Sequence, residues 1–251
     1  MSLFVPADSS GPAPLLVLLH GFAGQYDEFA AATGLLTEAS EAGVALLVPS
    51  GAGDPPTWEV QAGPADDVGF IDALLTDAAN DPCIDPTRVW LAGYSAGAGF
   101  AGRFACVGDR PLAGIVMNAA VFPASCDPGP LGVVVAHGTD DLVVPYTGLD
   151  IGTDDDPIVL PATPDLVAGW ADRLGCDPDP REVIGVESAN TRWTGCDDAT
   201  VDLVTYIGGG HRWPGRPLVG GEGLVVESPD LTCIVLSAVT ESADPVAACA
   251  P

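Results

Sequence analysis

Lysine is absent from this chain of 251 residues, so arginine supplies all eight of its basic side chains. Against them stand 35 acidic residues, which gives a formal net charge of −27 at pH 7. A surface of this sign repels phosphate backbones and anionic lipid headgroups, so nucleic acid and membrane surfaces are poor partners. The acids are spread along the chain, which indicates a solvated acidic shell; adaptation to a salt-rich habitat is the alternative.

Long apolar runs and paired metal-binding motifs are lacking too. No apolar run approaches the roughly 18 residues of a transmembrane helix, and residues 1–6 show no signal-peptide pattern. Seven cysteines are present, but none forms a Cys-x-x-Cys pair or has a histidine close by, so we expect no metal. Their wide spacing is typical of disulfides, which predicts a secreted protein whose leader is not present in this chain. Because seven is odd, at least one thiol remains unpaired.

Short apolar runs alternate with amphipathic segments along the chain. The runs predict buried strands, and the segments with apolar residues at helical spacing predict helices. Expected strands are 15–19, 44–48, 88–93, 115–117, 133–136 and 200–207; expected helices are 26–42, from Asp66 or Asp67 to 78, 96–107 and 163–175. Residues 231–239 fit a strand or a helix. This order predicts an α/β fold, with a mostly parallel central sheet, helices on both faces and one domain over 1–251.

The pentapeptide Gly93-Tyr94-Ser95-Ala96-Gly97 follows an expected strand and precedes an expected helix. That context makes G-x-S-x-G a nucleophile elbow, a tight turn that lifts the serine hydroxyl above the sheet edge. The flanking glycines are needed because the turn leaves no room for a Cβ. The alternative is a glycine-rich helix start without catalytic meaning.

A second glycine pattern overlaps the first. Residues 97–102 spell G-x-G-x-x-G, the dinucleotide fingerprint. That fingerprint expects its first glycine at the turn itself and an acidic residue at the end of the next strand. Here Ser95 occupies the turn and Asn118 follows the next strand, so close packing of a small-residue helix face explains the glycines better than nicotinamide binding does.

All three histidines fall at expected strand ends, where parallel α/β sheets bind ligands: His20, His137 and His211. Asp140 and Asp141 lie just beyond the strand that carries His137, and a carboxylate there can accept the Nδ1–H of a histidine. The chain order of Ser95, this acid pair and His211 is the Ser–Asp–His order of α/β-hydrolases.

At these residues the sequence resembles the secreted α/β-hydrolase esterases of the polyhydroxybutyrate depolymerase, feruloyl esterase and acetylxylan esterase type. The matching stretches cover most of residues 4–215, and the most distinctive is His211-Arg212-Trp213-Pro214-Gly215. They include residues 18–21, 66–71, 84–89, 93–97, 104–106, 137–146 and 208–215. The first sheet strand looks missing or shortened, and the chain beyond residue 216 matches less well.

The resemblance implies a division of roles among the candidate residues. It selects Asp141 over Asp140 as the acid of a Ser95–Asp141–His211 triad, and Cys106–Cys126 and Cys176–Cys196 as disulfides. Cys233 and Cys249 are a candidate third pair, which leaves Cys83. The backbone N–H groups of Phe22 and Ala96 are the expected oxyanion hole. Trp58, Trp213 and Phe22 are candidates for an apolar substrate cleft, with buried core aromatics as the alternative.

The expected function is hydrolysis of polymeric carboxylic esters through an acyl-enzyme, by a monomer that needs no cofactor. A polyhydroxyalkanoate or other polyester, and feruloyl or acetyl esters of plant polysaccharide, remain open as substrates. The alternative is a non-catalytic module of the same fold that binds a carbohydrate or polymer. An intact set of three triad residues weighs against that alternative.

Overall fold

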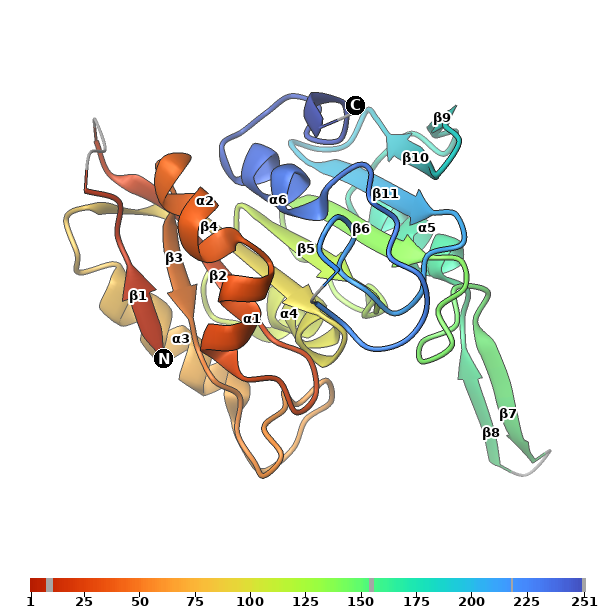
Figure 1. Ribbon diagram of the computed structural model, residues 1–251, viewed down its shortest axis with the longest axis horizontal. Helices are drawn as coiled ribbons and strands as arrows, with labels where there is room; N and C mark the ends of the chain where they lie inside the picture. The colour runs from red at the N-terminus through yellow and green to blue at the C-terminus, as the bar shows by residue number, and fades with distance from the viewer. Residues whose placement is uncertain (8–10, 154–155, 218, 250–251) are drawn as a thin grey trace.

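The computed structural model of the protein describes residues 1–7, 11–153, 156–217 and 219–249 (Figure 1). No helix within these ranges is long and apolar enough to cross a membrane.

Nine strands of the described residues form one sheet in the order β1-β3-β2-β4-β5-β6-β11-β10-β9. The six strands from β3 to β11 pair in parallel, whereas β1, β10 and β9 are antiparallel additions at the two edges. The mostly parallel sheet predicted from the sequence is therefore confirmed. The strands are β1 (Ser2–Phe4), β2 (Ala13–Leu19), β3 (Ala45–Val48), β4 (Ile84–Tyr94), β5 (Gly114–Asn118), β6 (Gly132–Gly138), β9 (Arg181–Ile184), β10 (Ser188–Trp193) and β11 (Thr200–Tyr206). The edge strand β1 has only three residues.

Helices cover both faces of the sheet, as predicted. One face carries α3 (Asp67–Ala78), α4 (Ala96–Val107) and α5 (Thr163–Arg173); the other carries α1 (Tyr26–Ala32), α2 (Leu35–Glu41) and α6 (Leu231–Val239). Successive side chains of a strand point to opposite faces of the sheet, so each central strand contributes side chains to two hydrophobic cores, one on each face. Val17 of β2 belongs to one core with Trp170, and Leu18 belongs to the other with Ile234.

The single helix predicted over residues 26–42 is wrong, because the structure has two helices there. The chain turns between α1 and α2 at Gly34, whose φ of 79° is left-handed and ends the first helix. The Thr33 hydroxyl donates to the carbonyl of Ala30 at 3.0 Å, which satisfies one of the carbonyls at the end of α1. Apolar spacing continues across the break, so periodicity alone did not reveal it.

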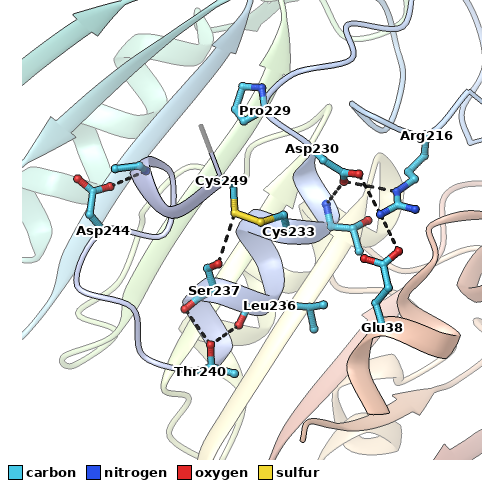
Figure 2. Close-up of a disulfide and its surroundings, with 12 residues drawn as sticks. Glu38, Arg216, Pro229, Asp230, Cys233, Leu236, Ser237, Thr240, Asp244 and Cys249 are labelled. Atoms are coloured by element: carbon cyan, nitrogen blue, oxygen red, sulfur yellow. Dashed lines mark hydrogen bonds and ion pairs between the residues drawn. A yellow bond between two sulfur atoms is a disulfide. The ribbon is translucent and has the colours of Figure 1, made fainter. Parts of the chain in front are cut away.

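The ambiguous segment 231–239 is the helix α6. Asp230 caps its first turn, since its Oδ1 accepts the N–H of Thr232 at 2.8 Å. Figure 2 shows the same carboxylate paired with Arg216, which also reaches Glu38 of α2. The cap and the burial of one helix face therefore favour a helix over a strand.

Three disulfides join parts of the described chain: Cys106–Cys126, Cys176–Cys196 and Cys233–Cys249. The first two are the pairs that the family resemblance implied, and the third is the candidate pair. The third ties α6 to the C-terminal segment through the short 3₁₀ helix η1 (Ala247–Cys249) (Figure 2). Cys83 is exposed and unpaired.

A two-stranded antiparallel hairpin, β7 (Leu149–Thr153) and β8 (Asp156–Leu160), forms its own small sheet. It lies between β6 and α5 in the chain and extends away from the body of the molecule (Figure 1).

Candidate active site

Ser95 occupies the turn between β4 and α4. Its backbone has φ 53° and ψ −116°, a conformation that side-chain-bearing residues rarely adopt. A Cβ added at Gly93 would lie 2.2 Å from the backbone of Gly97, and one at Gly97 would lie 2.4 Å from the carbonyl oxygen of Leu19. The two glycines therefore permit the tight strand-to-helix turn that the pentapeptide predicted, and the side chain of Ser95 is half-buried.

A line of hydrogen-bond distances connects Ser95 to Asp141 through His211. Ser95 Oγ lies 3.0 Å from His211 Nε2, and His211 Nδ1 lies 2.7 Å from Asp141 Oδ2. Asp141 follows β6, and His211 lies in the loop after β11, the strand paired with β6. Neighbouring strand ends thus bring together the three residues that the sequence singled out. In this geometry His211 can take the serine proton while Asp141 holds its ring.

Asp141 is held by four hydrogen-bond partners. Its Oδ1 accepts the backbone N–H groups of Val143 and Val144, both at 2.8 Å. Its Oδ2 lies near His211 Nδ1 at 2.7 Å and near His137 Nε2 at 3.2 Å. Burial alone would raise the pKa of this carboxyl, but the hydrogen bonds from His137 and His211 outweigh burial and hold the pKa well below its usual range. The surroundings of Asp141 therefore favour its ionised form.

Two side chains that the sequence analysis did not place in the site fix the loop of His211. The hydroxyl of Tyr94 donates to the carbonyl of His211 at 2.9 Å, and the two rings lie 5.1 Å apart. Burial raises the pKa of Tyr94 to about 12, so the hydroxyl keeps its proton. Asn118 donates from Nδ2 to the carbonyl of Arg212 at 2.9 Å. Tyr94 sits inside the elbow motif, but no sequence signal marked its contact 117 residues away.

The loop after β2 carries Phe22, one of the two expected oxyanion-hole residues. Ala23 donates its N–H to the carbonyl of Pro56 at 2.8 Å, which ties the loop to residues 51–58. The buried ring of His20 accepts the N–H of Gly51 at 3.0 Å, and burial lowers the pKa of His20, which keeps that acceptor available. Among the hydrogen bonds of the described residues, the N–H groups of Phe22 and Ala96 have no acceptor.

Trp58 and Trp213, two of the candidates for an apolar cleft, are buried in the core, which is the alternative that the sequence analysis left open. Trp58 is 3% exposed and donates to the carbonyl of His20 at 3.0 Å. Trp213 is fully buried and donates to Thr232 Oγ1 at 3.0 Å. Phe22 differs from both, since 66% of it is exposed. Of the three aromatic candidates, Phe22 alone is open to a substrate.

The overlapping G-x-G-x-x-G pattern is accounted for by packing. A Cβ at Gly99 would lie 3.0 Å from the side chain of Val60, and one at Gly102 would lie 2.6 Å from Cβ of Phe122. These glycines therefore let α4 pack closely on its neighbours, as the sequence analysis favoured.

No group of three or more metal-ligating side chains is gathered within the described ranges.

A cavity of about 630 Å³ lies elsewhere, between the β9–β10 hairpin and the C-terminal segment. Residues of the hairpin, Val204 and Val246 line it, but Ser95, Asp141 and His211 do not. The cavity is therefore separate from the site formed by Ser95, Asp141 and His211.

The known proteins that this chain resembles in sequence include esterases. No family model matches the chain. "Putative esterase NocK" of Nocardia uniformis subsp. tsuyamanensis is 29% identical over an alignment of 237 residues that covers 83% of this chain and 69% of that protein. Feruloyl esterase B of Piromyces equi is 28% identical over 79% of this chain and 39% of its own length. Feruloyl esterase C of Emericella nidulans is 29% identical over 66% of this chain and 56% of its own length. This chain therefore spans less than two thirds of either feruloyl esterase.

Similarity to solved structures identifies the fold of this chain. An acetyl xylan esterase from Aspergillus awamori superposes with a TM-score of 0.60 and 13% identity, over 83% of this chain and 87% of that one. A Bacillus cereus carboxylesterase superposes with a TM-score of 0.54 and 17% identity, over 84% and 85%. The chain thus has the α/β-hydrolase fold and, as its motifs predicted, resembles esterases that include feruloyl and acetylxylan esterases.

Proposed function

We propose that this protein is a serine carboxylic-ester hydrolase in which Ser95, His211 and Asp141 form the catalytic triad. One observation carries the proposal. Ser95, at a nucleophile elbow, lies within hydrogen-bond distance of the His211 ring, whose other nitrogen lies within hydrogen-bond distance of Asp141 Oδ2. The esterase names of the similar chains support the same chemistry.

In this mechanism, Ser95 Oγ attacks the ester carbonyl while His211 Nε2 takes its proton. The imidazolium then donates that proton to the departing alcohol, and Asp141 stabilises the positive ring throughout. Water next attacks the acyl-enzyme, with His211 again as the base, and releases the carboxylic acid.

The oxyanion of each tetrahedral intermediate is assigned to the N–H groups of Phe22 and Ala96. Both lack an acceptor among the hydrogen bonds of the described residues, so neither must break a bond to receive the oxyanion. Ala96 is also the first residue of α4, where the helix dipole favours negative charge.

The substrate that we propose is a polymeric ester: a polyhydroxyalkanoate or other polyester, or a feruloyl or acetyl ester of plant polysaccharide. Four exposed apolar residues near the site support a substrate with an apolar acyl or aromatic group. They are Phe22 (66% exposed), Leu142 (81%), Val143 (55%) and Leu224 (72%). We call this set the apolar rim. Leu142 follows Asp141 directly, and the carbonyl of Leu224 accepts the N–H of Gly210 at 3.0 Å, beside His211. The names of the similar esterases support feruloyl and acetyl groups.

A series of p-nitrophenyl esters, from acetate to a long acyl chain, tests the proposal with the wild type and Ser95→Ala side by side. We expect hydrolysis by the wild type and a loss of several orders of magnitude in kcat for the variant. No activity at any chain length, in a wild type with a native near-ultraviolet spectrum, would favour the non-catalytic binding module instead.

We further propose that the protein is secreted. Three disulfides support an oxidising compartment. Thiol titration tests the pairing: one thiol, that of Cys83, should react in the denatured protein without reductant, and seven should react after reduction. Seven reactive thiols before reduction would contradict both the pairing and the location.

A further inference from the structure

A second histidine lies against the proposed catalytic acid. His137 Nε2 is 3.2 Å from Asp141 Oδ2, the same oxygen that His211 Nδ1 approaches at 2.7 Å. The side chains of His137 and Asp141 are both fully buried. Bulk water therefore does not reach this contact in the folded protein.

The partners of His137 define its tautomer. Its Nε2 also lies 2.9 Å from the carbonyl oxygen of Val144, which can only accept a hydrogen bond. Nε2 therefore carries hydrogen and shares it between Val144 and Asp141. On the other side of the ring, Nδ1 lies 3.0 Å from Oγ1 of Thr163, the buried first residue of α5. In a neutral ring, Nδ1 accepts the hydrogen of that hydroxyl.

The contact completes the hydrogen bonding of Asp141. Backbone N–H groups occupy Oδ1, and the two histidines occupy Oδ2, so each carboxylate oxygen has two donors. A buried carboxylate that loses a donor is under-solvated and freer to rotate. Rotation would move Oδ2 away from the plane of the His211 ring.

We propose that His137, held by Thr163, is a positioning residue that fixes the carboxylate of Asp141 and, through it, the tautomer and orientation of His211. This role rests on the triad proposed above. The hydrogen bond from His137 also withdraws charge from Oδ2, which moderates the attraction of Asp141 for the imidazolium of His211. Two further ionisable side chains lie beside this group: Tyr146, whose ring lies 5.8 Å from that of His137, and Tyr94, whose ring lies 5.1 Å from that of His211.

Two matched pairs of variants test the role. His137→Leu removes every donor, whereas His137→Gln keeps an N–H at the end of the side chain. Thr163→Val removes the hydroxyl at nearly constant shape, whereas Thr163→Ser keeps it. We expect kcat on p-nitrophenyl acetate to fall about 10- to 100-fold for His137→Leu and about three- to tenfold for Thr163→Val, with KM unchanged. His137→Gln and Thr163→Ser should recover most of the loss.

The pH profile of kcat/KM separates positioning from mere packing. Loss of the donor leaves more charge on Asp141, so His137→Leu should raise the apparent pKa of the acidic limb, and His137→Gln should leave it near the wild-type value. A variant with full kcat and an unmoved profile would overturn the proposal, as would equal losses in both members of each pair. Thr163→Val decides the matter if the His137 variants do not fold.

Ser95→Ala keeps the two proposals distinguishable. If that variant is as active as the wild type, the proposed triad fails and the positioning role fails with it. If Ser95→Ala is inactive while His137→Leu and Thr163→Val keep wild-type rates, only the positioning role is wrong.

Discussion

Asp141 Oδ2 lies 2.7 Å from Nδ1 of His211, whereas the side chain of the adjacent Asp140 accepts a hydrogen bond from the hydroxyl of Thr139 at 3.2 Å. Two neighbouring carboxylates in the sequence thus have different surroundings. Asp141 is 3% exposed, and Asp140 lies at the surface.

The identity of the acid gives the first prediction. Asp141→Asn would favour the wrong tautomer of His211, so kcat should fall by about 10⁴-fold, the order of magnitude known for such a triad change. Asp140→Asn is the matched control and should stay within about twofold of the wild type, as expected of a surface substitution. The measurement is kcat on p-nitrophenyl acetate. Equal losses in both variants would contradict the assignment of Asp141.

Much of this arrangement could be predicted because its signals are local. Buried parallel strands read as short apolar runs, the elbow as a pentapeptide between a strand and a helix, and the histidines as residues at strand ends. The helix over 96–107 has the predicted bounds, and Asp66 caps α3 by accepting the N–H of Gly69. Short-range patterns of this kind do not depend on the rest of the fold.

The sequence did not reveal which side chains meet once the chain is folded. Trp213 stands two residues from His211 in the sequence, yet tertiary packing buries its indole, like that of Trp58, in the core. The contact of His137 with Asp141 was not foreseen either, although the two residues are four apart. A strand end followed by a turn decides where those side chains meet, and neither residue type encodes it.

Phe22 gives the second prediction, because it alone of the aromatic candidates is exposed. Phe22→Ala keeps the backbone N–H assigned to the oxyanion but removes an apolar contact of the rim. We expect a higher KM for p-nitrophenyl esters of long or aromatic acids, with little change for the acetate. Leu142→Ala should act in the same direction.

Trp58→Phe is the matched control for substrate binding. Its ring is buried beneath the loop, so the substitution should lower the free energy of unfolding and leave the ratio of KM values between long and short esters unchanged. If Trp58→Phe shifted that ratio and Phe22→Ala did not, the assignment of the exposed rim to substrate binding would be wrong.

Asp202 of β11 gives the third prediction. This fully buried carboxylate has Arg192 Nη2 at 3.3 Å and Asn190 Nδ2 at 3.3 Å. Burial raises its pKa to about 6, against the opposing attraction of Arg192. Between roughly pH 4 and pH 6 the folded state therefore holds a proton that the unfolded chain has lost.

The sign of the effect follows from that difference. Below roughly pH 4 Asp202 is protonated in both states, and between there and pH 6 only the unfolded chain ionises. The contribution of Asp202 to the free energy of unfolding therefore falls by about 3 kcal/mol over this range and stays constant above it. Urea unfolding of the wild type and Asp202→Asn at pH 4 and pH 7 measures most of this change: the difference between the two proteins should shift by about 2 kcal/mol in favour of the variant. A constant difference would mean that Asp202 titrates normally.

The excess of negative charge gives the fourth prediction. Seven ion pairs occur among the described residues, two of them involving histidine, so most acidic side chains of these residues form no ion pair. Salt weakens those few attractions, but it also screens the repulsion of a net charge of −27, and the second effect concerns many more charges. The midpoint of thermal unfolding should therefore rise with sodium chloride and level off near 1 M, where the screening length is only about 3 Å. Sorbitol, which carries no charge, is the control. An unfolding midpoint that does not change with salt would show that the acidic residues lie far enough apart to repel one another only weakly. That result would contradict the alternative that the acidic composition is an adaptation to a salt-rich habitat.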